Sequence, residues 1–183
     1  MRITKLIVLI FIVLSSTLLN AEDRDVNLNR LFKELKSNNV KSAYEAEKKI
    51  WKIWSTHPTD QQLTDRLAEG SKLVRDNQLF EAVEIFTEVI NIDPIWAEAW
   101  NKRATVLYLM SDYNGSQNDI DEVLRLEERH FGALAGQGLV NIKLKKYEKA
   151  LMSYEKAQKF YPSMKSVKGM IKKIEKQIRR QST

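Results

Sequence analysis

The chain has 183 residues, a formal net charge of +6 and no cysteine. The absence of cysteine excludes disulfide bonds, thiol catalysis and cysteine-ligated metal sites. The length that remains after a short leader suits one domain of ordinary size, so we expect a single fold that is stabilised by packing alone.

Charge is unevenly distributed along the chain. Residues 143–180 contain 13 Lys and Arg residues and 3 acidic residues, a net charge of +10, whereas residues 22–142 are net acidic. In a cytosolic protein such a basic end indicates nucleic-acid binding. The first 21 residues, described next, indicate export, and an exported protein does not routinely meet nucleic acid. We therefore expect an acidic protein partner or an anionic membrane surface, and no nucleic acid.

Residues 1–21 have the pattern of a secretory signal peptide. Two basic residues form a positive start, an unbroken apolar run covers residues 6–14, and Ala21 offers a cleavage site. The alternative is an uncleaved anchor, because Leu19 is large for the −3 position and the apolar stretch approaches the minimum length of a membrane span. We expect a periplasmic or secreted protein, with an inner-membrane anchor facing the periplasm as the alternative.

The next segment, residues 27–62, fits part of a pattern that is complete further along the chain. Ala46, Ile50 and Pro58 have the spacing of the small, large and terminating residues of the later segments, but the stretch 28–35 lacks a small residue. We predict a degenerate first helix pair here.

Residues 63–164 contain three segments of equal length, and Pro94 and Pro162 occupy the same position in the first and the third. Within the segments, small and large residues recur at the positions where two antiparallel helices pack closely, and proline then ends the second helix. The segments are 63–96, with Gly70, Ala82 and Phe86; 97–130, with Trp100, Ala104, Leu107 and Tyr113; and 131–164, with Leu134, Gly138, Tyr147, Ala150 and Tyr154. The middle segment has Glu128 in place of the proline.

The length of the segments and this pattern resemble the tetratricopeptide repeat, whose period is about 34 residues. The resemblance implies an all-α, right-handed solenoid of helix-turn-helix repeats. Residues 165–183 are expected to cap it, since Val167, Ile171, Ile174 and Ile178 lie on one helical face and can cover the last apolar surface. The other faces of this basic helix carry lysine and arginine, so a helix that lies on a membrane is the alternative.

Two stretches extend the resemblance beyond the generic repeat. Residues 96–105 (WAEAWNKRAT) and 126–134 (LEERHFGAL) resemble exported or anchored tetratricopeptide proteins of alphaproteobacteria, which usually have proline where Glu128 stands. This family resemblance implies the fold and an envelope location, and it implies no reaction.

The repeat register also predicts a concave groove. Counting from Leu63 places ten residues in it, namely Leu67, Ser71, Val74, Arg75, Asn101, Thr105, Tyr108, Leu139, Ile142 and Lys143. Chaperone cofactors with a two-carboxylate clamp are similar in fold, but the clamp's basic positions in the third repeat are Gly132 and Gly136 here. These glycines allow either close helix packing or the approach of a ligand backbone. A mainly apolar groove favours an extended or helical apolar peptide.

Catalytic motifs are not evident. His57 and His130 lie in turns without a serine or cysteine partner placed by any motif, so we expect loop or capping roles. The stretch from Asp112 to Asp121 resembles a calcium loop but fails at both ends. We predict no enzyme activity, cofactor, metal site or small-molecule substrate.

The sequence thus predicts an exported, non-catalytic tetratricopeptide scaffold that binds a protein or peptide partner. We expect the central groove residues Asn101, Thr105 and Tyr108 to contribute most to binding. The alternative function is a membrane-tethered assembly factor that uses an uncleaved anchor and the basic C-terminal helix.

Overall fold

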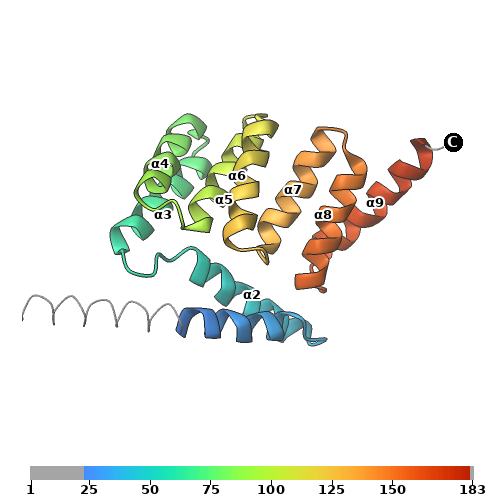
Figure 1. Cartoon of the computed structure of the whole chain (residues 1–183), viewed down its shortest axis with the longest axis horizontal. Coiled ribbons are helices and arrows are strands. Elements are labelled where there is room, and N and C mark those ends of the chain that lie inside the picture. The colour runs from blue at the N-terminus through green and yellow to red at the C-terminus, as the bar shows by residue number, and fades with distance from the viewer. Residues whose placement is uncertain (1–22, 182–183) are drawn as a thin grey trace, which may run out of the picture.

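The computed structural model describes residues 23–181, and every regular element in that range is a helix (Figure 1). The predicted signal peptide or anchor, residues 1–21, lies outside the described residues. A helix over residues 23–35 comes first, and the others are α2 (Val40–Trp54), α3 (Gln61–Arg75), α4 (Leu79–Ile92), α5 (Ala97–Leu109), α6 (Tyr113–Leu126), α7 (Phe131–Lys143), α8 (Tyr147–Phe160) and α9 (Lys165–Gln181). Within residues 23–181, no helix has the length and apolar character needed to cross a membrane.

The helices from α3 to α8 form three antiparallel pairs that stack side by side, with α9 at the end of the row (Figure 1). The turn inside each pair contains one residue in the left-handed region, with φ of 60° at Asn77, 65° at Ser111 and 58° at Lys145. These residues follow one another at the period of the repeat. In each turn the backbone N–H of the residue that follows the left-handed one bonds back to a carbonyl near the end of the first helix, as in Asp112 N to Leu107 O at 2.9 Å, which closes that helix.

Close contact within the first and third pairs depends on glycine facing an aromatic ring. A Cβ atom added at Gly70 would lie 2.6 Å from Cε1 of Phe86, and one at Gly138 would lie 2.5 Å from Cε2 of Tyr154. Both rings are buried. The ring of the second helix therefore lies directly on the backbone of the first, and any side chain at these glycines would separate the pair.

Several helices begin at a side chain that satisfies a free backbone N–H. Asp60 accepts hydrogen bonds from the backbone of Gln62 and Leu63 at the start of α3. Asp112, which belongs to the stretch that resembles a calcium loop, accepts from the Gly115 N–H at 2.9 Å and caps α6. Its carboxylate is thus used as a helix cap.

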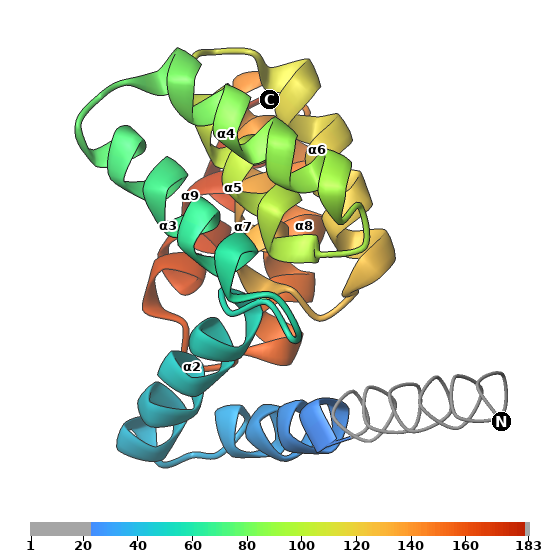
Figure 2. The ribbon, with the colours of Figure 1, turned by 90° about the vertical axis from the view of Figure 1, so that its left-hand side faces the viewer.

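The helix of residues 23–35 and α2 together form an N-terminal hairpin that does not stack as a further repeat. We expected a degenerate repeat upstream of α3, but the hairpin packs beneath the row of pairs, across one edge of the solenoid (Figures 1 and 2). Its apolar residues share a core with Phe131 at the start of α7 and Tyr161 after α8. Arg129 donates to Asn29 at 2.6 Å and Tyr161 donates to Glu47 at 2.8 Å, so contacts between distant parts of the chain hold the hairpin in place.

The last helix, α9, covers the far end of the row. Val167 and Ile174 are buried in one core with Ala150 and Tyr154 of α8, and Ile171 and Ile178 pack against the same core. The lysines and arginines at the remaining positions of α9 are exposed. The apolar face of α9 is therefore used inside the molecule, and its basic faces meet solvent.

Candidate peptide-binding groove

A small cleft lies between α5 and α7, the first helices of the second and third pairs. It has a volume of ≈ 80 Å³. Asn101, Thr105 and Tyr108 line it from α5, Leu139 lines it from α7, and α6 contributes Ile120. The remaining lining residues are Ala104, Ser116, Gly132, Ala133 and Gly136.

The two glycines of α7 that line the cleft have different environments. A Cβ atom at Gly136 would meet only Cδ1 of Ile120 at 3.7 Å, which is ordinary contact distance. A Cβ atom at Gly132 would lie 2.5 Å from Cη2 of Trp51 in α2. Gly132 is thus explained by close packing within the chain, whereas Gly136 leaves part of the cleft open.

Aromatic residues of the N-terminal hairpin pack beside the cleft at Gly132. The Trp51 ring centroid lies 5.4 Å from that of Phe131 and 5.5 Å from that of His130. Trp54 stacks on His130 with ring centroids 4.0 Å apart, and its backbone carbonyl accepts a hydrogen bond from Trp96 Nε1 at 2.8 Å. The hairpin therefore fixes the positions of the first turns of α5 and α7.

A buried polar cluster lies beneath these rings. Nδ1 of His130 accepts from the backbone N–H of Ala133 at 3.0 Å, so the ring proton is on Nε2, which donates to Glu98 Oε2 at 3.1 Å. Lys102 Nζ lies 3.2 Å from Glu98 Oε1. Burial raises the pKa of the Glu98 carboxyl, but the hydrogen bond from His130 and the nearby Lys102 ammonium outweigh burial, so this pKa lies below its ordinary value.

This cluster also orients a groove residue, because Asn101 Nδ2 donates to Glu98 Oε2 at 3.0 Å. The side-chain NH2 group of Asn101 is therefore hydrogen-bonded within the protein. His130 caps α7 through its bond to Ala133, and Nε2 of His57 lies 2.6 Å from Asp93 Oδ2, which ties the turn before α3 to the turn after α4. Both histidines thus have the loop and capping roles expected from the sequence.

Four of the ten predicted groove residues line the cleft together: Asn101, Thr105, Tyr108 and Leu139. Thr105 and Leu139 are exposed, whereas Tyr108 is half-buried with its ring centroid 5.6 Å from that of Tyr113. The central part of the predicted groove is therefore brought together around one cleft.

The other predicted groove residues lie outside this cleft. Leu67 is a correction: it is only 2% exposed and belongs to the core around Phe86 and Trp96, so it is not available to a ligand. The Ser71 hydroxyl donates to its own helix at Leu67 O, 2.8 Å away. Val74 packs against the first pair's core and Ile142 against the core under α8 and α9. Arg75 and Lys143 are exposed at the ends of their helices.

Trp51, which packs on Gly132 beside the cleft, is the residue that sequence reasoning missed. The pair Trp51 and Trp54 is the one available signal, because two tryptophans one turn apart in a helix form a large apolar surface that needs a partner. Nothing in the repeat spacing indicated that the partner surface is His130 and Gly132.

Known proteins share the sequence pattern and the fold of these helix pairs. Residues 132–164 match the family model of the tetratricopeptide repeat. The first TPR domain of Spaghetti (RPAP3), solved with the HSP90 peptide SRMEEVD, is similar with a TM-score of 0.63 and 20% identity over 65% of this chain and 95% of that domain. The fold is a tetratricopeptide-repeat solenoid.

Similar proteins are also found by sequence. A TPR repeat-containing protein of Rhizobium etli is 29% identical over 60% of this chain and 53% of its own length. The Hsp70-Hsp90 organizing protein 1 of Glycine max is 26% identical over 78% of this chain and 25% of its own length. The matched region thus spans about half of the first relative and a quarter of the second.

Proposed function

We propose that this chain is a non-catalytic scaffold that binds a segment of a partner protein in the cleft between α5 and α7. The observation that carries the proposal is the convergence of Asn101, Thr105, Tyr108 and Leu139 on one cleft of the solenoid. An amide, a hydroxyl, a phenol and an exposed apolar side chain together suit a peptide, whose backbone needs hydrogen bonds and whose side chain needs apolar contact.

The size of the cleft supports a peptide anchor over a small-molecule ligand. A volume of ≈ 80 Å³ is well below the roughly 300–1,000 Å³ of typical small-molecule pockets. Such a cleft accommodates one side chain of a segment that continues across the neighbouring surface. A few central residues then account for most of the binding energy, with tyrosine prominent among them.

The chemistry of the cleft favours an apolar or neutral segment over an acidic chain end. The similar RPAP3 domain was solved with a peptide whose sequence is rich in acidic residues. In this chain, the two positions of α7 that would have to be basic for a carboxylate clamp are Gly132 and Gly136, and Trp51 occupies the space beside Gly132. We therefore assign the cleft to a partner segment without a terminal carboxylate.

The cellular location belongs to the same proposal. The basic start and the apolar run over residues 6–14 support export to the periplasm, and an uncleaved anchor with a role in membrane-associated assembly is the alternative. The mass of the mature protein separates the two, because cleavage after Ala21 leaves an amino terminus at Glu22.

The binding proposal is tested with a matched pair of variants. Thr105 is exposed and lines the cleft, so Thr105→Arg places a long charged side chain in it without disturbing the core. Asn118→Arg makes the same kind of change at an exposed position of α6 outside the cleft. In crosslinked envelope extracts, the partner should be lost with Thr105→Arg and retained with Asn118→Arg. Retention of the full set of partners by a folded Thr105→Arg variant would contradict the proposal.

A further inference from the structure

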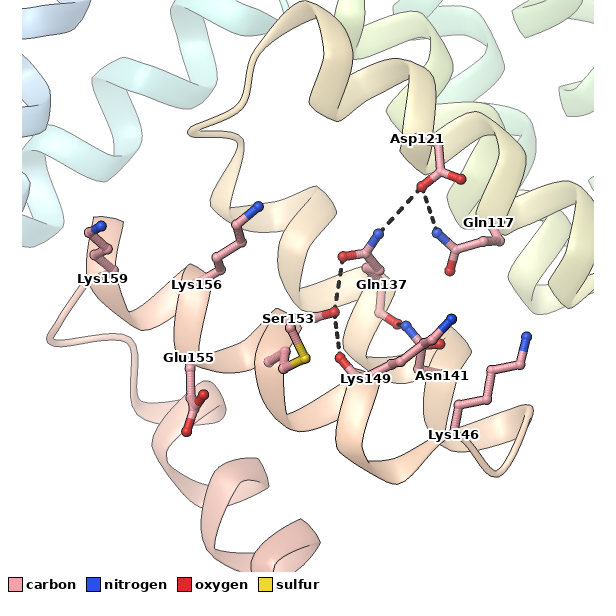
Figure 3. Close-up of a pocket in the computed structure, with 11 residues that line it drawn as sticks. Gln117, Asp121, Gln137, Asn141, Lys146, Lys149, Ser153, Glu155, Lys156 and Lys159 are labelled. Atoms are coloured by element: carbon pink, nitrogen blue, oxygen red, sulfur yellow. Dashed lines mark hydrogen bonds between the residues drawn. The ribbon is translucent and has the colours of Figure 1, made fainter.

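A second, larger cleft lies between α6 and α8, with side chains of α7 at its floor (Figure 3). Its volume is ≈ 700 Å³, and it shares no lining residue with the cleft between α5 and α7. Lining residues come from α6 (Gln117 and Asp121), from α7 (Gln137 and Asn141), and from α8 and the residue before it (Lys146, Lys149, Met152, Ser153, Glu155, Lys156 and Lys159).

The floor of this α6–α8 cleft is a connected polar network. Gln117 and Gln137 each donate to Asp121 Oδ1, at 2.8 and 3.4 Å, and Gln137 Oε1 accepts from Ser153 Oγ at 2.9 Å (Figure 3). Asn141 is only 6% exposed and donates to the Gln137 carbonyl at 3.0 Å. These bonds connect three helices, so the floor is held in one arrangement.

The rim along α8 is net basic, because it carries four lysines and one carboxylate, Glu155. Lys146, Lys149, Lys156 and Lys159 are exposed, and within the described part of the chain none of them forms a salt bridge. Figure 3 shows Glu155 extending to the other side of α8 from Lys156. Four ammonium groups on one rim repel each other, and an anionic occupant would offset that repulsion.

The shape of the rim distinguishes between anions. Thirteen helical steps separate Lys146 from Lys159, which corresponds to roughly 20 Å along the helix axis. A single phosphate group contacts only a small part of that length, whereas an extended peptide of about six residues covers it at roughly 3.3 Å per residue. Met152, which is 65% exposed, lies between Lys149 and Lys156 and offers an apolar contact in the middle of the row.

We propose that the α6–α8 cleft binds an extended acidic segment of a partner protein, with acidic side chains on the lysine rim and an apolar side chain on Met152. The recessed floor favours a peptide over a flat membrane surface. This site is independent of the groove proposed above.

The test uses a fluorescent six-residue peptide of five glutamates and one leucine, with a peptide of five glutamines and one leucine as the control ligand. Anisotropy titrations at low salt should show binding of the acidic peptide only. Lys149→Gln with Lys156→Gln should weaken that binding about tenfold, because each substitution removes one ion pair between an exposed lysine and a glutamate of the peptide. Binding should also weaken as salt screens the exposed charges.

The matched control removes two lysine charges from α9 instead of from the rim of the cleft. Lys168→Gln with Lys172→Gln changes two exposed lysines of α9 and should alter the affinity twofold or less. Thr105→Arg should leave it unchanged, which separates this site from the groove between α5 and α7. The proposal is overturned if both lysine pairs weaken binding equally, if the glutamine peptide binds as well, or if millimolar phosphate displaces the peptide. It also fails if only phosphatidylserine vesicles bind and the α9 pair alone abolishes that binding.

Discussion

Alanine substitutions at the two glycines of α7 that line the cleft, Gly132 and Gly136, should have different effects on stability. Replacement of glycine by alanine inside a helix raises the free energy of unfolding by up to ~1 kcal/mol through helix propensity. At Gly136 the new methyl group would lie 3.7 Å from Ile120, so Gly136→Ala should stabilise the protein by about that amount. At Gly132 the methyl group would overlap the Trp51 ring at 2.5 Å.

The Trp51 ring has little room to move away. Its centroid is 5.4 Å from those of Trp54 and Phe131 and 5.5 Å from that of His130, so three rings surround it. Overfilling a packed site of this kind costs ~1–3 kcal/mol, which exceeds the propensity gain. We expect Gly132→Ala to be neutral or destabilising by up to ~2 kcal/mol, and to be less stable than Gly136→Ala by ~1–3 kcal/mol.

Urea unfolding followed by far-ultraviolet circular dichroism measures both free energies of unfolding. We also expect Gly132→Ala to become favourable when Trp51→Ala has removed the ring, which would be a coupling between the two sites. Equal stabilisation by Gly132→Ala and Gly136→Ala in the wild-type background would show that Trp51 does not lie on α7 and that the N-terminal hairpin packs elsewhere.

Three further substitutions test other parts of the structure. Ala150→Leu should destabilise by ~1–3 kcal/mol in urea unfolding because Ala150 is fully buried between α7 and α8, whereas the exposed Ala68→Leu should have little effect; equal effects would contradict the helix register. Glu128→Pro should stabilise by ~0.4–1 kcal/mol, since Glu128 occupies the turn position that proline has in the other repeats; a lower melting temperature would mean that its backbone N–H is needed. The pKa of Glu98 is lowered in the folded state, so its contribution to stability is present above the unfolded pKa of about 4.3 and is lost as pH falls through the folded value. Glu98→Gln should therefore flatten the acid limb of the urea midpoint against pH, and an unchanged acid limb would show that Glu98 does not stabilise the fold electrostatically.

The solenoid could be predicted from sequence because its determinants are local and periodic. Gly70 and Phe86 have the same separation along the chain as Gly138 and Tyr154, and each pair meets in adjacent helices. The spacing of such pairs, which recurs from repeat to repeat, is enough to identify the helices and their contacts. The left-handed turn residue Lys145 follows the same period, although its side chain gives no sign of that conformation.

The N-terminal hairpin could not be placed because its contacts join distant, non-repeating positions. Ala46 and Ile50 have the spacing of a repeat, and both are buried, but their core includes Phe131 and Tyr161. A small residue followed by a large one has the same spacing whichever surface it packs against. The position of the N-terminal hairpin therefore depends on the aromatic side chains Trp51 and Trp54, which do not recur at the repeat period.

Only the central positions of the candidate groove line one cleft in the structure. Asn101, Thr105 and Tyr108 lie one and two turns apart on α5 and line one cleft with Leu139, as the repeat register implies. Leu67 has the same register position as Asn101 but is buried with Phe86 and Trp96. Position in a repeat defines a direction from the helix, and the size of the neighbouring side chains decides whether that direction leads to solvent.

The most direct test of the central claim is site-specific photocrosslinking from the cleft between α5 and α7. A benzophenone amino acid at position 139, where Leu139 is 39% exposed and lines the cleft, should crosslink a partner protein in envelope extract. The same group at the exposed position 118 of α6 should not capture that partner. Capture from position 118 and not from position 139, or equal capture from both, would contradict a partner site in this cleft.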